Sequence, residues 1–155
     1  MEFLTGFAGS LIPFLLILTV LVFVHEMGHY WVARRNGVRV EVFSVGFGPE
    51  LFGWNDKHDT RWKVSAIPLG GYVKMYGDAD PASATSEGLE EMTPDQKAVS
   101  FHYKSVAQRI AIVAAGPAAN FIFAIVVLAG LFMVVGQRYA PATIDEVMPE
   151  SAAAA

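Results

Sequence analysis

The chain has 155 residues, of which 54% are hydrophobic and only 17% are charged. This balance is typical of a membrane protein rather than a soluble globular domain, and the net charge of −4 gives no support for binding to nucleic acid. Because the chain has no cysteine, disulfides and thiolate metal ligands are excluded, so any metal must be held by His, Asp or Glu.

The first apolar segment, residues 11–33, is long enough to cross a bilayer as one helix. Ser10 is a candidate N-cap, and Pro13 would fall in the first turn, where its missing N–H does little harm. A secretory signal peptide fits poorly, because no basic residue precedes the segment and no small-residue cleavage site follows it. We therefore expect residues 1–36 to form a first transmembrane helix.

The motif H-E-M-G-H occupies residues 25–29 of this helix. Residues four apart share a helix face, so His25 and His29 can reach one ion, whereas Glu26 projects to the side of the pair. In zinc hydrolases with this H-E-x-x-H pattern, the metal activates a water and the glutamate moves its proton to the leaving nitrogen. The sequence predicts His25 and His29 as ligands of Zn²⁺ and Glu26 as the catalytic base.

The alternative explanation of the motif is a polar cluster that stabilises helix packing. Ionisable side chains cost about 2.5–3.5 kcal/mol each at the centre of a spanning helix, so their chance placement there is disfavoured. Metal binding is the better interpretation.

Residues 37–77 alternate apolar and polar side chains in short runs, which is typical of β-strands. The polar turn N-D-K-H-D at residues 55–59 predicts a hairpin. We expect a small antiparallel sheet of four strands, between Val38 and Tyr76, lying against the membrane face. Some of its many aromatic side chains would pack on the helices or enter the membrane interface, whereas ordinary sheet packing accounts for most of them.

Residues 78–97 are acidic, rich in small residues and punctuated by proline, which favours a flexible loop. The segment S-F-H-Y-K-S-V-A-Q-R, residues 100–109, then predicts an interfacial helix, so that residues 78–105 form a cytoplasmic loop and interfacial helix. The second apolar segment, residues 110–136, carries no charge and predicts a second transmembrane helix within residues 106–137.

Small residues open the second span, in the sequence A-A-G-P-A-A at residues 114–119. They would allow close helix packing. Asn120 follows them and would either bond to a neighbouring helix or help to hold a substrate. The basic residues set the orientation, since ten of the 11 Lys and Arg lie between Arg34 and Arg109. By the positive-inside rule, loop 34–109 is cytoplasmic and the N-terminus lies on the outer side of the membrane.

Three long motifs carry a resemblance to a known family: VHEMGHYWVARRNGVRVEVFSVGFGP, IPLGGYVKMYGD and KSVAQRIAIVAAGPAANFIFAI. They resemble the site-2 protease family of intramembrane zinc metalloproteases, and most of all its bacterial RseP-type branch. The resemblance implies an inner-membrane protease that cuts single-span membrane proteins, such as anti-sigma factors and remnant signal peptides, among membrane lipids.

The resemblance also implies roles for two groups of residues in the predicted sheet. One is the edge of a membrane-associated β-loop that pairs with the unfolding substrate, and the other resembles a glycine-containing loop near the active site, although simple turn chemistry explains the latter equally well. The edge residues are Gly70, Gly71, Tyr72 and Val73. The loop residues are Gly46 and Gly48.

The family's third zinc ligand is an aspartate in an L-D-G motif on a later span, and this sequence contains no such motif. Residues 138–155 resemble the start of a periplasmic PDZ domain. We therefore expect an α-helical membrane protein with two transmembrane helices and a small antiparallel sheet, truncated at the PDZ domain and catalytically incomplete by itself. The alternative function is a non-catalytic scaffold of the same fold that binds transmembrane helices. Metal transport is disfavoured, because the second span has no ionisable residue.

Overall fold

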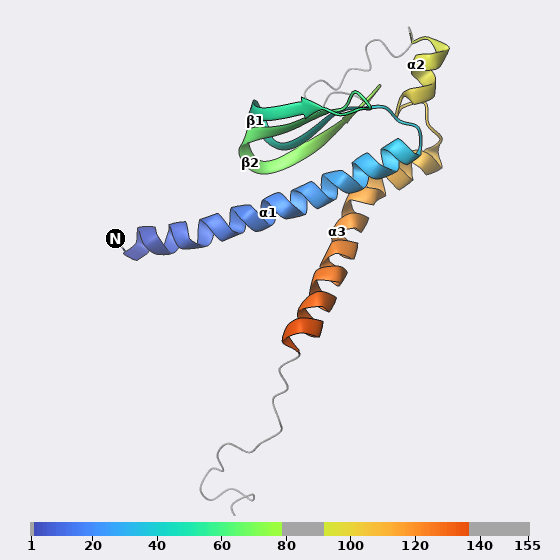
Figure 1. Ribbon diagram of the computed structural model, residues 1–155. Coiled ribbons are helices and arrows are strands. Elements are labelled where there is room, and N and C mark those ends of the chain that lie inside the picture. The colour runs from blue at the N-terminus through green and yellow to red at the C-terminus, as the bar shows by residue number, and fades with distance from the viewer. Residues whose placement is uncertain (1, 79–91, 137–155) are drawn as a thin grey trace, which may run out of the picture. The chain divides into compact units, whose positions relative to one another are not determined.

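The computed structural model describes residues 2–78 and 92–136, with side chains from Gly9 onwards. Its elements are, in chain order, α1 (Glu2–Arg35), β1 (Val40–Asn55), β2 (Arg61–Met75), α2 (Pro94–Val99) and α3 (Val106–Val135), as Figure 1 shows. Contacts divide the chain into two units, Met1–Ala124 and Ile125–Ala155, and the sheet, the core and the candidate site lie in the first. The expected start of a PDZ domain, residues 138–155, falls outside the described residues.

Two helices are long and apolar enough to cross a membrane, over Gly9–Arg35 with a mean hydropathy of 2.1 and Val106–Val135 with 2.6. Large apolar side chains such as Ile17 and Phe121 are 61% and 72% exposed, which suits contact with lipid rather than water. The two predicted spans are confirmed, but α1 begins well before residue 11. Ser10 is therefore not an N-cap, and Pro13 lies inside the helix.

The sheet consists of two long strands, β1 and β2, which pair antiparallel around a turn at residues 56–60. The predicted hairpin is confirmed, whereas the predicted count of four strands is wrong, because each long strand joins two of the expected ones. Val42 pairs with both Lys74 and Arg61, so the first half of β1 lies between the two halves of β2. Residues 42–45 pair with residues 61–64 in the same ascending order. Their pairing with residues 71–74 runs in the opposite order.

The fold-back places the end of β2 at the border of the sheet. Residues 71–75 pair with residues 40–45 on one side, and the structure gives them no strand partner on the other side within the described residues. Gly46 and Gly48, with φ of 89° and 84°, supply the left-handed conformations at the bend of β1. The sheet thus has an unpaired edge along the end of β2.

The core joins the C-terminal half of α1 to the sheet and to the beginning of α3. Ala33, Val40, Phe43 and Ile112 are each at most 1% exposed. Phe43 also stacks on the Trp62 ring with the centroids 4.2 Å apart. Because this core lies on the half of α1 that carries the H-E-x-x-H motif, it fixes the sheet beside the motif (Figure 1).

A short helix lies where none was expected. The sequence favoured a loop up to residue 97 and a helix over residues 100–109, but α2 spans Pro94–Val99 and residues 100–105 are not helical. Thr93 explains the difference, since its side chain and that of Gln96 form a capping box that begins α2 at Pro94. The residues from Val106 on belong to α3 itself.

Asp56 ties the turn of the sheet to α1. Its Oδ2 accepts hydrogen bonds from the Tyr30 hydroxyl at 3.1 Å and the Trp62 indole at 3.0 Å. Its Oδ1 accepts from the backbone N–H groups of His58 at 2.8 Å and Thr60 at 3.1 Å. Burial by itself would raise the pKa of the Asp56 carboxyl, but these four hydrogen bonds outweigh it and lower the pKa from 3.8 to about 2.

Replacing Asp56 by Asn should destabilise the protein by about 1–3 kcal/mol at pH 7, because an amide turns an N–H toward groups that can only donate. The wild-type carboxylate contributes fully above pH 4 and loses its charge as the pH falls toward 2, so the difference from Asp56→Asn should shrink over that interval. Denaturant unfolding in detergent at several pH values measures this.

The matched control is Asp59→Asn in the same turn. Asp59 has a φ of 61°, which asparagine tolerates well, so the control should unfold like the wild type. Equal stabilities of the two variants at pH 7 would contradict the role of Asp56.

Candidate metal site on the first spanning helix

Two histidine nitrogens converge on α1 four residues apart. Nε2 of His25 and Nε2 of His29 are 3.2 Å from each other, and the rings meet edge to face at 78°. Two nitrogens that bind one tetrahedral zinc at 2.0–2.1 Å are about 3.3 Å apart. The pair therefore fits two corners of a zinc site, and both side chains are half-buried.

α3 holds the opposite side of each ring. Nδ1 of His29 is 2.8 Å from the Ile112 carbonyl oxygen, and Nδ1 of His25 is 3.3 Å from the Asn120 amide. The two helices run in opposite directions here, since the earlier histidine meets the later residue of α3. Each imidazole is thus oriented through Nδ1, which leaves both Nε2 atoms for a metal.

Glycines allow this close approach. A Cβ on Gly116 of α3 would lie 2.7 Å from Nε2 of His25, and it would also overlap Nε2 of His29. A Cβ on Gly28 of α1 would lie 2.8 Å from the Cβ of Ala119. The predicted close packing at small residues is confirmed at these positions.

The described residues supply only two ligands. They contain no group of three or more His, Cys, Asp or Glu side chains that could hold a metal ion. Catalytic zinc sites have three protein ligands and one open position. The chemistry of the two histidines fits zinc, and a further ligand is needed to complete a catalytic site.

The unpaired sheet edge meets α1 beside the motif. A Cβ on Gly71 would lie 3.2 Å from Cγ of Glu26 and 2.8 Å from Cγ1 of Val22. The neighbouring Gly70 lies under the Phe47 ring, and this ring stacks with the Tyr72 ring at a centroid distance of 6.3 Å. Of the edge residues predicted from the sequence, Gly71 therefore lies next to the predicted catalytic base.

The glycine-containing loop has a different environment. A Cβ on Gly46 would meet the carbonyl oxygens of Ser65 and Ile67 at 2.9 and 2.8 Å. Gly48 likewise faces the Ile67 side chain, and no described contact joins either glycine to the histidines. The loop places the Phe47 ring over Gly70 at the sheet edge. A direct role of the loop at the active site stays a prediction.

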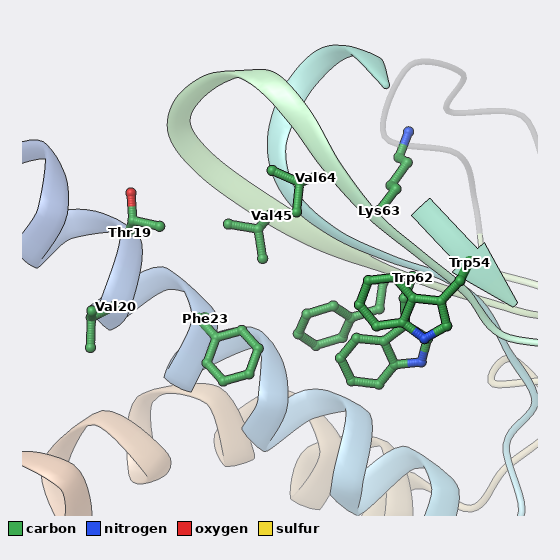
Figure 2. Close-up of a pocket in the computed structure, with 9 residues that line it drawn as sticks. Thr19, Val20, Phe23, Val45, Trp54, Trp62, Lys63 and Val64 are labelled. Carbon is green, nitrogen blue, oxygen red and sulfur yellow. The ribbon is translucent and has the colours of Figure 1, made fainter. Parts of the chain in front are cut away.

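An apolar groove of about 410 Å³ lies between α1 and the sheet. Figure 2 shows Phe23 on the helix side, opposite Val45 and Trp62 on the sheet side. Phe23 precedes His25 by two residues, but none of His25, Glu26 and His29 lines the groove. Its lining residues are Thr19, Val20, Phe23, Phe43, Val45, Trp54, Trp62, Lys63 and Val64.

Three contributors to the site were not found from the sequence. The Ile112 carbonyl is a backbone group, which no residue pattern identifies. Gly28 is visible inside the motif, and its smallness was the available signal for close helix packing. The sequence predicts a polar turn at Asp56 but no role for its side chain. An Asp that accepts from backbone N–H groups two and four residues later, here those of His58 and Thr60, is typical of a capped turn.

Comparisons with known proteins give a family and several relatives. Residues 13–153 match peptidase family M50. A Mesorhizobium japonicum protein named as a zinc metalloprotease is 53% identical over 150 residues, which cover 96% of this chain and 41% of that protein. The metalloprotease MmpA of Caulobacter vibrioides is 44% identical over 159 residues, covering 97% of this chain and 40% of that protein.

The protease RseP of Yersinia pestis is 46% identical over 145 residues, which cover 94% of this chain and 30% of that protein. The chain thus spans about two fifths or less of the length of these curated relatives. The region that they share with it contains the two histidines, Glu26 and the sheet.

Replacing Gly116 by Ala should weaken zinc binding by about 10- to 100-fold, because the new methyl group would push the two imidazoles apart. Competition with a chelator on the full-length protein measures this affinity. The control is Gly130→Ala on the same helix, where a Cβ has open space and alanine favours the helix. A Gly116→Ala protein that binds zinc as the control does would rule out this arrangement of the site.

Proposed function

Because the chain belongs to peptidase family M50, the site-2 proteases with their RseP-type members, we propose that it forms part of an intramembrane zinc endopeptidase. The observation that carries the proposal is the pair of Nε2 atoms 3.2 Å apart on a helix apolar enough to span the membrane, with Glu26 beside them. Polar groups at that depth are costly unless they serve a function.

The cofactor is Zn²⁺, in agreement with the names of the relatives. His25 and His29 would hold it through Nε2, and we expect a third ligand, an aspartate, from outside these 155 residues. When bound, zinc supplies Lewis acidity and lowers the pKa of the attacking water toward about 7.

Glu26 is the proposed base. A carboxylate oxygen of Glu26 takes a proton from the attacking water and gives it to the nitrogen of the departing amine. Its position one residue after His25 lets it reach that water without being a ligand. A Cβ on Gly71 would lie 3.2 Å from Cγ of Glu26, which supports a base close to the sheet edge.

The sheet edge is the proposed substrate dock. A transmembrane helix must unwind before its peptide bonds can be attacked, and unwinding exposes backbone N–H and C=O groups in an apolar medium. Strand addition to residues 70–73 would satisfy these groups and hold the extended segment beside Glu26. The neighbouring apolar groove would accept the side chains of that segment (Figure 2).

The setting is a bacterial inner membrane, as two apolar helices and an RseP relative indicate. We propose that loop 34–109 is cytoplasmic, which places the site in the cytoplasmic half of the bilayer. The substrates would be single-span membrane proteins, with anti-sigma factors and remnant signal peptides as the expected classes. They would be cut near the cytoplasmic end of the span.

Replacing Glu26 by Gln should lower cleavage about 10²- to 10⁴-fold and leave zinc bound, because the amide cannot take the proton. The assay uses the full-length protein in detergent and a reporter with one transmembrane helix and a short periplasmic tail, with zinc content measured on the same samples. If neither wild type nor variant cuts while both bind the reporter, the protein is a scaffold and the protease proposal fails.

Replacing Gly71 by Ala should reduce cleavage while zinc stays bound, because a Cβ there would separate the edge from Val22 and Glu26. The matched control is Gly53→Ala on the other border of the sheet. A Cβ at Gly71 would lie 2.6 Å from the Ser44 oxygen, and one at Gly53 would lie 2.7 Å from the Trp62 oxygen, so the local strain is similar. Equal losses of cleavage in both variants would contradict a substrate dock at Gly71.

A further inference from the structure

Asn120 has one amide atom bonded and the other without a partner. Its Nδ2 is 3.3 Å from Nδ1 of His25, while its Oδ1 is buried and has no hydrogen-bond partner among the described residues. Buried amide oxygens in folded proteins almost always accept a hydrogen bond. The Asn120 oxygen is therefore a buried acceptor that needs a donor.

The proton on His29 is fixed by its partner. The Ile112 carbonyl oxygen, 2.8 Å from Nδ1, can only accept, so Nδ1 of His29 carries the hydrogen. In a neutral ring Nε2 then has a lone pair. His29 thus presents a lone pair toward His25 in every neutral state of the site.

As a zinc ligand, His25 needs its Nε2 lone pair, so the proton of a neutral His25 is on Nδ1, where it would oppose the N–H of Asn120. A half turn of the amide about its Cβ–Cγ bond exchanges Nδ2 and Oδ1 without changing the shape of the side chain. The oxygen then accepts the Nδ1–H of His25 and gains the partner that it lacked.

We propose that Asn120 is the positioning residue of His25, with its amide oxygen turned toward Nδ1 of that ring. The oxygen would hold the His25 proton on Nδ1 and leave Nε2 free for zinc. The Ile112 carbonyl does the same for His29 permanently. This inference rests on the zinc site of the proposed function, and it assigns the outer partner of each ligand to α3.

The test compares zinc affinities of the full-length protein by chelator competition. Asn120→Leu keeps the size of the side chain but cannot accept, so it should bind zinc about 10- to 100-fold more weakly. Asn120→Asp has two acceptor oxygens and no N–H, so it should bind zinc at least as tightly as wild type. The matched control is Gln108→Leu, the same loss of an amide on α3, at a residue that bonds to Ser105 rather than to the histidines.

Rescue by aspartate distinguishes positioning from packing, because a residue that only packs would be disturbed by a charge as much as by leucine. Asn120→Leu with wild-type affinity, or Asn120→Asp as weak as Asn120→Leu, would overturn the inference. His25→Ala in the same assay separates a failure of the proposed zinc site from a failure of the role of Asn120. If wild type binds zinc no better than His25→Ala, the proposed zinc site fails as well, whereas a difference there without an effect at Asn120 refutes only the role of Asn120.

Discussion

The contact between α1 and α3 at the level of the two histidines is the constraint on which the rest of the structure depends. Imidazoles in an apolar helix need partners for their nitrogens, because unpaired polar groups are expensive in a medium without water. Gly28 and Gly116 remove the side chains that would keep the helices apart. α3 can then bring the Ile112 carbonyl and the Asn120 amide to the rings, which leaves both Nε2 atoms for the metal.

The sheet uses the same half of α1 for a different purpose. The aromatic core around Phe43 and the hydrogen bonds to Asp56 fix the sheet on the last turns of the helix. Because Asp56 keeps a pKa of about 2, this attachment does not change over the physiological pH range. Gly71 then lets the unpaired edge reach Glu26, so that one helix carries the proposed metal ligands, the proposed base and the support of the proposed substrate dock.

The sequence predicted much of this arrangement, because its strongest signals are local. The two spans follow from long apolar runs, and the motif follows from the spacing of three residues on one helix face. The double pairing of β1 could not be predicted, since it depends on how Gly46 and Gly48 bend one long strand. The same holds for the bonds from α3 to the histidines, because contacts 83 and 95 residues apart in sequence leave no periodic trace.

The most direct measurement is X-ray absorption at the zinc edge of the full-length protein. We expect two imidazole nitrogens at about 2.0–2.1 Å from the zinc, and oxygen atoms as the remaining ligands. Replacing both His25 and His29 by Ala should abolish the imidazole contribution. A first shell without imidazole, or a spectrum that is unchanged in the double variant, would contradict the assignment of these two histidines as the zinc ligands.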